Sequence, residues 1–338
     1  MSRWLLSLIL ATALPVAADD LLEDRGVFWP PFFAEFQDVE LAGDRAYMFG
    51  VGGLVIFDVS DPDDPLFLGR YAPPDDRADR FYRGSIGGDH AYGGAREGGL
   101  AVVHLQPPTA PTLALEIAPD GISYEGSTVA DGYLYACRHD AGLEIFDLDD
   151  PASPVPVSVM PTLVNSWDVV VRDGLAYVAD GTGGLAIVDV SEPTTPVLVA
   201  SAPIAGAAAS DVALAGDVAV VAAGSTGLVL FDVSDPADPT WLATHDTSGL
   251  AATVAVDGHL AFVADWDDVE VVDITAPAAP VAAGRENTPG RAMGLDAAAG
   301  RVHVADWSRF RIFDHGPTSR GDIEVPRWFE FGFTPIGG

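Results

Sequence analysis

Three aspartates spaced along the chain could bind a calcium ion. Asp38, Asp168 and Asp211 each begin a short apolar stretch, such as Asp-Val-Val-Val at 168–171. Ca²⁺ takes about six to eight oxygen ligands. Three carboxylates gathered at one narrow opening of the folded protein would therefore form a candidate Ca²⁺ site. Arg83 stands at the equivalent place in another stretch. Since this arginine, or water, could equally relieve the repulsion between the carboxylates, both interpretations stay open.

Arginines form a second candidate group, of the kind that binds anions. All 17 basic residues are arginine, and three of them lie in an insertion at 73–83. The group consists of Arg77, Arg80, Arg83, Arg96 and Arg138, with His139 beside the last. Arginine offers a bidentate fork to carboxylate or phosphate, which predicts a clamp for such a ligand. The alternative is that the arginines of the insertion pair with its own aspartates and hold the loop together.

Aromatic residues form a third group, which we expect to lie on the same face of the folded protein as the arginines. They are Tyr82, Tyr124, Trp167, Trp266 and Trp307. Exposed rings around a concave mouth suit sugar rings, peptides or cations. The alternative is that the repeated Asp-Trp pairs pack between neighbouring sheets.

Signatures of catalysis are otherwise missing from the sequence. It contains no Gly-x-Ser-x-Gly, His-Glu-x-x-His, phosphate-loop or dinucleotide motif. A carboxylate pair such as Asp168 with Asp211 could act on a glycoside, but an acidic chain offers such pairs by chance. The single cysteine, Cys137, is interpreted as a small apolar strand residue. We therefore predict no catalytic residue and no cofactor, the Ca²⁺ site apart.

The chain is built from a repeated sequence motif, called the repeated phrase below, and the repeats must position these groups. The motif reads GLAIVDVSEPTTP at 184–196. The chain contains seven copies in all, two of which match this sequence less closely. The copies are anchored on Leu54, Leu100, Leu143, Leu185, Leu228, Val269 and Phe310, spaced 41 to 46 residues apart. A fixed period of this length marks a repeat architecture.

Each copy predicts four short antiparallel strands. In the fourth copy these are 168–171, 176–178, 185–188 and 197–199, the first two joined by the turn residues Asp173-Gly174. The third strand is apolar on both faces, as expected between packed sheets. The Asp that ends it is interpreted as a cap on the turn that follows. Seven such units with exposed edges favour closure into a ring, which predicts an all-β, seven-bladed β-propeller of four-stranded antiparallel blades.

The repeats also resemble a known family. Val55–Asp58, Ile187–Asp189 and Val271–Asp273, each followed by a proline-bearing turn, are similar to the LVIVD repeat of exported bacterial and archaeal β-propeller proteins. The resemblance implies this architecture and a surface or periplasmic location, and it carries no general catalytic motif. The second copy departs from it, with His104 in place of the Asp, and so does the seventh.

The sequence at the two ends of the chain predicts export and terminal segments that cover the junction between the first and last repeats. Residues 1–18 have the basic, apolar and small-residue regions of a signal peptide. Residues 19–36 are predicted as a linker and clasp, 37–326 as the propeller and 327–338 as a C-terminal tail. Prolines at 30 and 31 argue against a ladder strand in the clasp. Each blade is expected to come from contiguous sequence, with the two tails covering the seam.

The net charge of −33 limits the kinds of partner that this protein can bind. Such a surface repels phosphate backbones, so nucleic acid and anionic membranes are poor partners. No segment is long and apolar enough to span a bilayer. We predict an exported, monomeric binding module that recognises a protein, peptide or glycan at the channel mouth. The alternative function is a propeller hydrolase or lyase that acts on a sugar or lactone.

Overall fold

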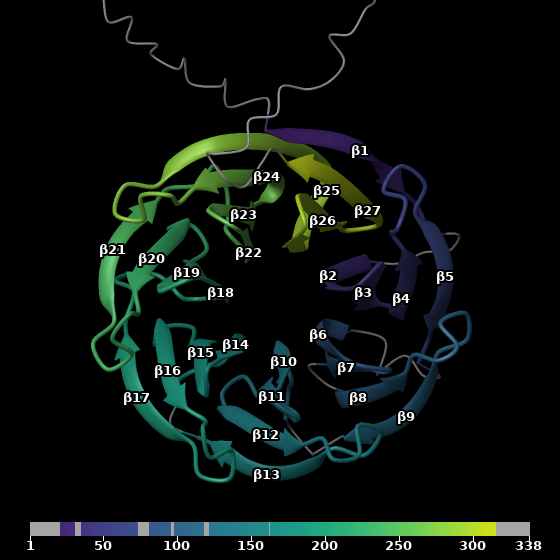
Figure 1. The fold of residues 1–338 in the computed structure, drawn as a ribbon, viewed down its shortest axis with the longest axis horizontal. Coiled ribbons are helices and arrows are strands. Elements are labelled where there is room, and N and C mark those ends of the chain that lie inside the picture. The colour runs from purple at the N-terminus through teal and green to yellow at the C-terminus, as the bar shows by residue number, and fades with distance from the viewer. Residues whose placement is uncertain are drawn as a thin grey trace, which may run out of the picture.

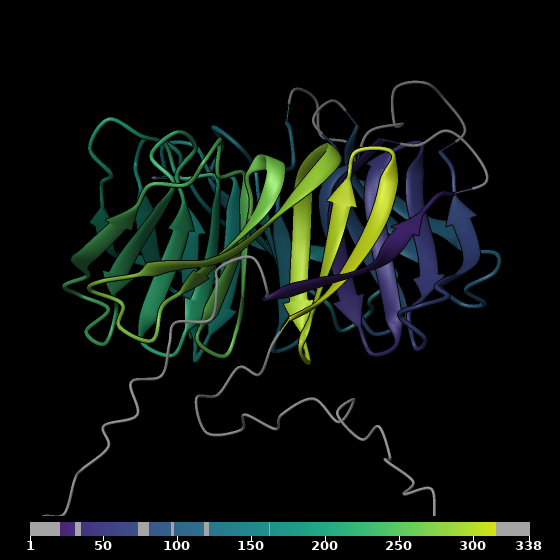
Figure 2. The same ribbon diagram turned by 90° about the horizontal axis from the view of Figure 1, so that it is seen from above.

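The fold is a ring of antiparallel sheets around a central channel (Figure 1). The computed structural model describes residues 21–30, 35–73, 81–95, 98–117, 122–161 and 163–315. Over these ranges the secondary structure is entirely β, and no helix there could cross a membrane. Seen from the side, the strands run roughly between the two faces of the ring (Figure 2). This confirms the all-β, propeller-like fold class.

Five of the sheets have four strands each, in sequence order. The first contains β2 (Glu35–Ala42), β3 (Arg45–Val51), β4 (Gly53–Asp58) and β5 (Leu66–Tyr71). The second contains β6 (Phe81–Gly87), β7 (His90–Ala95), β8 (Gly99–His104) and β9 (Thr112–Ile117). The third contains β10 (Ser127–Ala130), β11 (Tyr133–Cys137), β12 (Leu143–Asp147) and β13 (Val155–Met160). The fourth contains β14 (Asp168–Arg172), β15 (Leu175–Ala179), β16 (Leu185–Asp189) and β17 (Val197–Ala202). The fifth contains β18 (Asp211–Ala215), β19 (Val218–Ala222), β20 (Leu228–Asp232) and β21 (Thr240–His245).

The remaining sheet has seven strands, in the order β1-β27-β26-β25-β24-β23-β22. They are β1 (Leu22–Phe28), β22 (Thr253–Asp257), β23 (Leu260–Ala264), β24 (Trp266–Asp273), β25 (Val281–Ala298), β26 (Arg301–Asp306) and β27 (Arg309–His315). The 18-residue strand β25 has two roles. Its first part, 281–287, pairs with β24, and its last part, 292–298, pairs with β26.

The Asp that ends the third strand caps the next turn, as predicted. The carboxylate of Asp189 accepts hydrogen bonds from the backbone N–H of Ser191 at 2.9 Å and from its hydroxyl at 2.6 Å. Asp232 accepts a bond from the N–H of Ser234 in the same way. A short acidic side chain bonded to the backbone two residues ahead stabilises a turn locally. The aspartates are therefore architectural.

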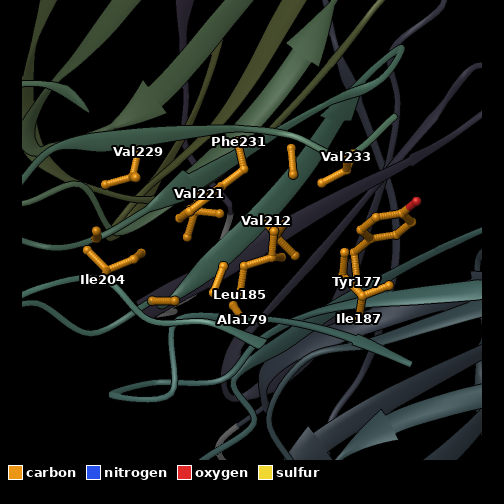
Figure 3. Close-up of a cluster of buried hydrophobic side chains, with 14 residues drawn as sticks. Tyr177, Ala179, Leu185, Ile187, Ile204, Val212, Val221, Val229, Phe231 and Val233 are labelled. Atoms are coloured by element: carbon orange, nitrogen blue, oxygen red, sulfur yellow. The ribbon is translucent and has the colours of Figure 1, made fainter. Parts of the chain in front are cut away.

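The core lies between adjacent sheets, and the third strands are buried on both faces. Figure 3 shows one such layer, in which Leu185 and Ile187 of β16 face Val212, Val221 and Phe231 of the next sheet. Leu185 and Ile187 have no exposed surface. Burying such side chains is worth about 1.5–3 kcal/mol each, so every sheet is stabilised mainly by its two neighbours.

The closure of the ring differs from the prediction. The N-terminal strand β1 pairs antiparallel with β27, from Leu22 opposite His315 to Phe28 opposite Phe310. In Figure 1 the purple β1 accordingly runs beside the yellow strands. The expectation of contiguous sequence throughout was wrong, because the prolines of the clasp come after Phe28 and leave 22–28 free to pair. Arg311 strengthens this join by donating to Asp24. The predicted signal peptide and C-terminal tail lie outside the described residues.

The channel mouth as candidate functional site

One face of the ring gathers the tips of the hairpins between second and third strands. Each tip residue lies four positions after the middle of the second strand of its repeat, as Gly181 follows Tyr177. The backbone of the tip residue pairs with the segment that leads into the first strand of the next repeat. Such pairs join Gly181 to Ala209 and Trp266 to Ala292. The tips and the starts of the first strands therefore lie together on this face.

In five of the repeats the tip position has a left-handed backbone. Gly181 and Gly224 have φ values of 53° and 56° there, which glycine adopts without strain. Three repeats place large residues in the same conformation: His139 at 50°, Trp266 at 70° and Trp307 at 51°. Positive φ is unusual for bulky residues. Two of the predicted aromatics and the predicted histidine thus occupy strained positions.

Trp266 and Trp307 lie on either side of one arginine that the sequence analysis missed. The guanidinium carbon of Arg291 is 5.0 Å from the centroid of Trp266 and 5.3 Å from that of Trp307. The same residues line a cavity of about 270 Å³ together with Tyr82. Its other lining residues are Glu35, Gln37, Val51 and Met293. We call this cavity the tryptophan pocket. Three of the five predicted aromatics therefore meet at one place.

The other two aromatics lie elsewhere. Tyr124 is only 1% exposed, and its hydroxyl donates to Glu144 at 2.6 Å. Arg138 is paired with the same carboxylate at 3.2 Å. Tyr124 and Arg138 are thus parts of an internal network, which corrects their prediction as exposed binding groups. Trp167 packs edge-on against His139, with 5.0 Å between the ring centroids. Arg77, Arg80 and Arg96 lie outside the described residues.

The starts of the first strands bring the predicted carboxylates around Arg83. The Nη1 atom of Arg83 lies 3.4 Å from Asp168 and 3.2 Å from Asp211. Asp38 accepts a hydrogen bond from the N–H of Gly84, the next residue along, at 3.2 Å. All of them line a channel cavity of about 450 Å³. Arg83 therefore supplies the positive charge among these carboxylates.

The channel is more acidic than the sequence analysis expected. Glu40 and Asp296 also line it, two residues after Asp38 and Gly294. Residues at i and i+2 of a strand share a face, and this signal could have found both. Asp296 also joins distant parts of the chain, since its carboxylate accepts a hydrogen bond from the N–H of Leu41 at 2.9 Å.

Burial shifts the pKa values of these groups. It raises the pKa of Asp38 to about 6, although the charge of Arg83 acts in the opposite direction. Burial, with the neighbouring charge of Asp211, raises the pKa of Asp168 well above its usual value. The pKa of Glu40 is raised for the same reason, by burial and then by Asp38. Burial alone would lower the pKa of Arg83, but the carboxylates outweigh it and raise that pKa. Protonated and charged carboxyls can therefore coexist here near neutral pH.

A separate acidic cluster lies near the tip that carries Trp266. It contains Asp265, Asp268 and Glu270, with one carboxylate oxygen of each within 4.8 Å of the others. Asp265 accepts hydrogen bonds from the N–H of Gly249 at 2.5 Å and the hydroxyl of Ser248 at 3.0 Å. Asp180 holds the equivalent loop, through the N–H groups of Val164 and Asn165. Asp265 is therefore a loop-holding residue. Over the ranges that the structure describes, Asp38, Asp168 and Asp211 do not form a comparable group.

The repeats match a known family profile. The LVIVD repeat matches at residues 35–72, 128–162, 165–202, 206–247 and 248–288. The chain belongs to the LVIVD repeat family. The second and seventh copies, which depart most in sequence, fall outside the matched LVIVD segments. No curated protein matches the chain significantly.

Solved propellers share the fold at low sequence identity. The crystal structure of the RRP9 WD40 repeats has 10% identity and a TM-score of 0.69, covering 89% of this chain and 99% of that one. The U3-55K structure has 11% identity and a TM-score of 0.68, with 89% and 99% coverage. The Cps50 (Swd1) beta-propeller domain from Myceliophteria thermophila has 12% identity and a TM-score of 0.69, with 87% and 100% coverage. At these identities the likeness supports the β-propeller scaffold alone.

Proposed function

We propose that this protein is an exported interaction module that binds a basic peptide segment of a partner protein at the tryptophan pocket. The observation that carries the proposal is the backbone conformation of Trp266 and Trp307. Each occupies a left-handed tip position that two other repeats fill with glycine.

The conformation matters because it is unfavourable for the residues that adopt it. A left-handed backbone costs an L-residue about 1–2 kcal/mol, and such strain is concentrated at ligand-binding positions. Glycine at 181 and 224 shows that the tip itself needs no side chain. The indole rings at 266 and 307 therefore have a use that outweighs their strain, and binding is the use that the pocket supports.

Charge and ring chemistry favour a basic ligand. The guanidinium carbon of Arg291 already lies 5.0 Å and 5.3 Å from the two ring centroids, within the range of a cation–π contact, and this supports a cationic ligand. Trp266 keeps 38% of its surface exposed for a further contact. The net charge of −33 and the carboxylates of the neighbouring channel attract cations. An arginine-bearing or lysine-bearing peptide fits both properties.

Three further features belong to the proposal. We infer seven blades, counting 281–287 of β25 as the outer strand of one blade and 292–298 as the inner strand of the next. On this count β1 is the outer strand of the last blade. The signal-peptide pattern of residues 1–18 supports export. A single closed ring is proposed to act as a monomer.

The test uses the full chain and an array of short peptides of basic, neutral and acidic composition, with a glycan array beside it. Peptide binding is followed by isothermal titration calorimetry, which does not depend on the two indoles that the variant removes. The variant carries Trp266→Gly and Trp307→Gly, which keep the left-handed backbone that glycine prefers. The control is Trp241→Ala, which removes a 62% exposed ring from β21.

We expect basic peptides to bind and the double variant to bind them at least about tenfold more weakly, as for loss of an aromatic hot spot. The control variant should bind like the parent. Equal binding by the double variant, or binding confined to acidic peptides or glycans, would contradict the proposal.

A further inference from the structure

Two histidines face each other in the second sheet, at a place where the other repeats have none. His104 ends β8, where the other copies carry the turn-capping Asp, and His90 lies directly opposite it on β7. The equivalent pair is Leu175 with Asp189 in the fourth sheet. In the first sheet it is Arg45 with Asp58. Both members of one cross-strand pair have thus become histidine.

The backbone around the pair keeps the form of the other repeats. The N–H of Leu105 donates to the carbonyl of Asp89 at 2.8 Å, just as Val190 donates to Gly174 at 2.8 Å. The turn therefore forms without an Asp at 104. Folding does not require the two imidazoles, so their chemistry is free for another use.

The rings are placed close enough to share an ion. Their centroids lie 5.0 Å apart with 65° between the ring planes. The Nε2 atom of His90 is buried and has no hydrogen-bond partner. Two imidazoles bound to one tetrahedral ion at about 2.0–2.1 Å have their ring centroids about 5 Å apart. The observed separation agrees with that geometry, and the ion would satisfy the orphaned nitrogen.

We infer that His90 and His104 form a binding site for a late divalent transition metal, Cu²⁺ or Zn²⁺. Imidazole nitrogen suits these ions, and Cu²⁺ binds such ligands more tightly than Zn²⁺ does. Water would complete the ligand set, since the Asp89 carboxylate is held by a hydrogen bond from Gln106 at 2.9 Å and does not form a three-residue group with the two histidines. The site lies at the end of β7 opposite the hairpin tips, so it is distinct from the tryptophan pocket.

The experiment titrates the full chain, without an affinity tag, with CuCl₂ and ZnCl₂ in a calorimeter, and records the electron paramagnetic resonance spectrum of the Cu²⁺ form. The variants His104→Asp and His90→Leu introduce residues that other repeats carry at these places, so both should fold. Thermal denaturation checks this. His139→Gly is the matched control, because it removes a histidine at a tip where other repeats have glycine.

We expect one ion per chain and a spectrum that shows coupling to two nitrogens. Each variant of the pair should lower affinity at least about tenfold, since a lost ligand costs at least as much as a lost second-shell partner. The control should bind like the parent. Unchanged affinity in His104→Asp or His90→Leu, or no Cu²⁺ binding by the parent chain, would overturn the inference.

Discussion

Replacing Arg83 by methionine should destabilise the ring in a way that depends on pH. Its guanidinium lies within 3.4 Å of Asp168 and 3.2 Å of Asp211, and its side chain is only 17% exposed. Removing one partner of a buried ion pair costs about 3–5 kcal/mol, because the other charges stay buried without compensation. We expect a loss of this size in the free energy of unfolding at pH 8.

The loss should shrink as the pH falls. The pKa of Asp38 is about 6 in the folded protein, above its value of about 3.9 in an unfolded chain. Such a group holds its proton more tightly when folded, so the stability it contributes rises as the pH falls from above 6 toward 4. Without Arg83, whose charge lowers the pKa of Asp38, that pKa rises further. Protonation then removes the repulsion that the variant suffers at pH 8.

Urea denaturation at pH 8 and pH 5, followed by circular dichroism, measures both values. Arg172→Met is the control, because Arg172 has a 33% exposed side chain and its nearest carboxylate, on Asp173, is 3.9 Å away and 92% exposed. It should cost only about 1 kcal/mol, since it loses an exposed ion pair and one hydrogen bond to the carbonyl of Gly216. Adding Asp168→Asn and Asp211→Asn to the Arg83 variant should restore most of the lost stability. Equal losses at both pH values, or no rescue, would refute the reasoning.

Two further predictions concern the repeat and the ring closure. Gly184→Ala should cost about 3 kcal/mol or more in thermal denaturation, because its Cβ would collide with the carbonyl oxygen of Ala202 at a φ of 80°. Gly224→Ala should cost only about 1–2 kcal/mol, since its Cβ would meet nothing within 4 Å; similar costs at the two positions would contradict this argument. Asp24→Ala should cost about 2–4 kcal/mol in urea denaturation, because it leaves the 95% buried side chain of Arg311 without its carboxylate; an unchanged midpoint would show that the join of β1 to β27 adds little.

Much of the fold could be predicted because its rules are local. The turn cap at Asp189 involves a residue two positions away, and the left-handed Gly184 begins the same phrase. The alternation of apolar residues over four or five positions decides which strands are buried. Seven copies of one local pattern then specify a ring of repeats. The sequence by itself therefore determined the strands of the repeats, their order and the role of the repeated phrase, but not the pairing of residues 22–28.

The candidate sites needed the tertiary structure, because they combine residues from distant repeats. The tryptophan pocket joins Tyr82 to Trp307, and the N–H of Leu41 meets Asp296 only when the ring closes. Burial also reversed the prediction for Tyr124, since no local pattern told its ring from an exposed one. The pairing of β1 with β27 also depended on the tertiary structure. A strand pairs with any free edge that its hydrogen bonds can reach, and only the closed ring brings residues 22–28 to that edge.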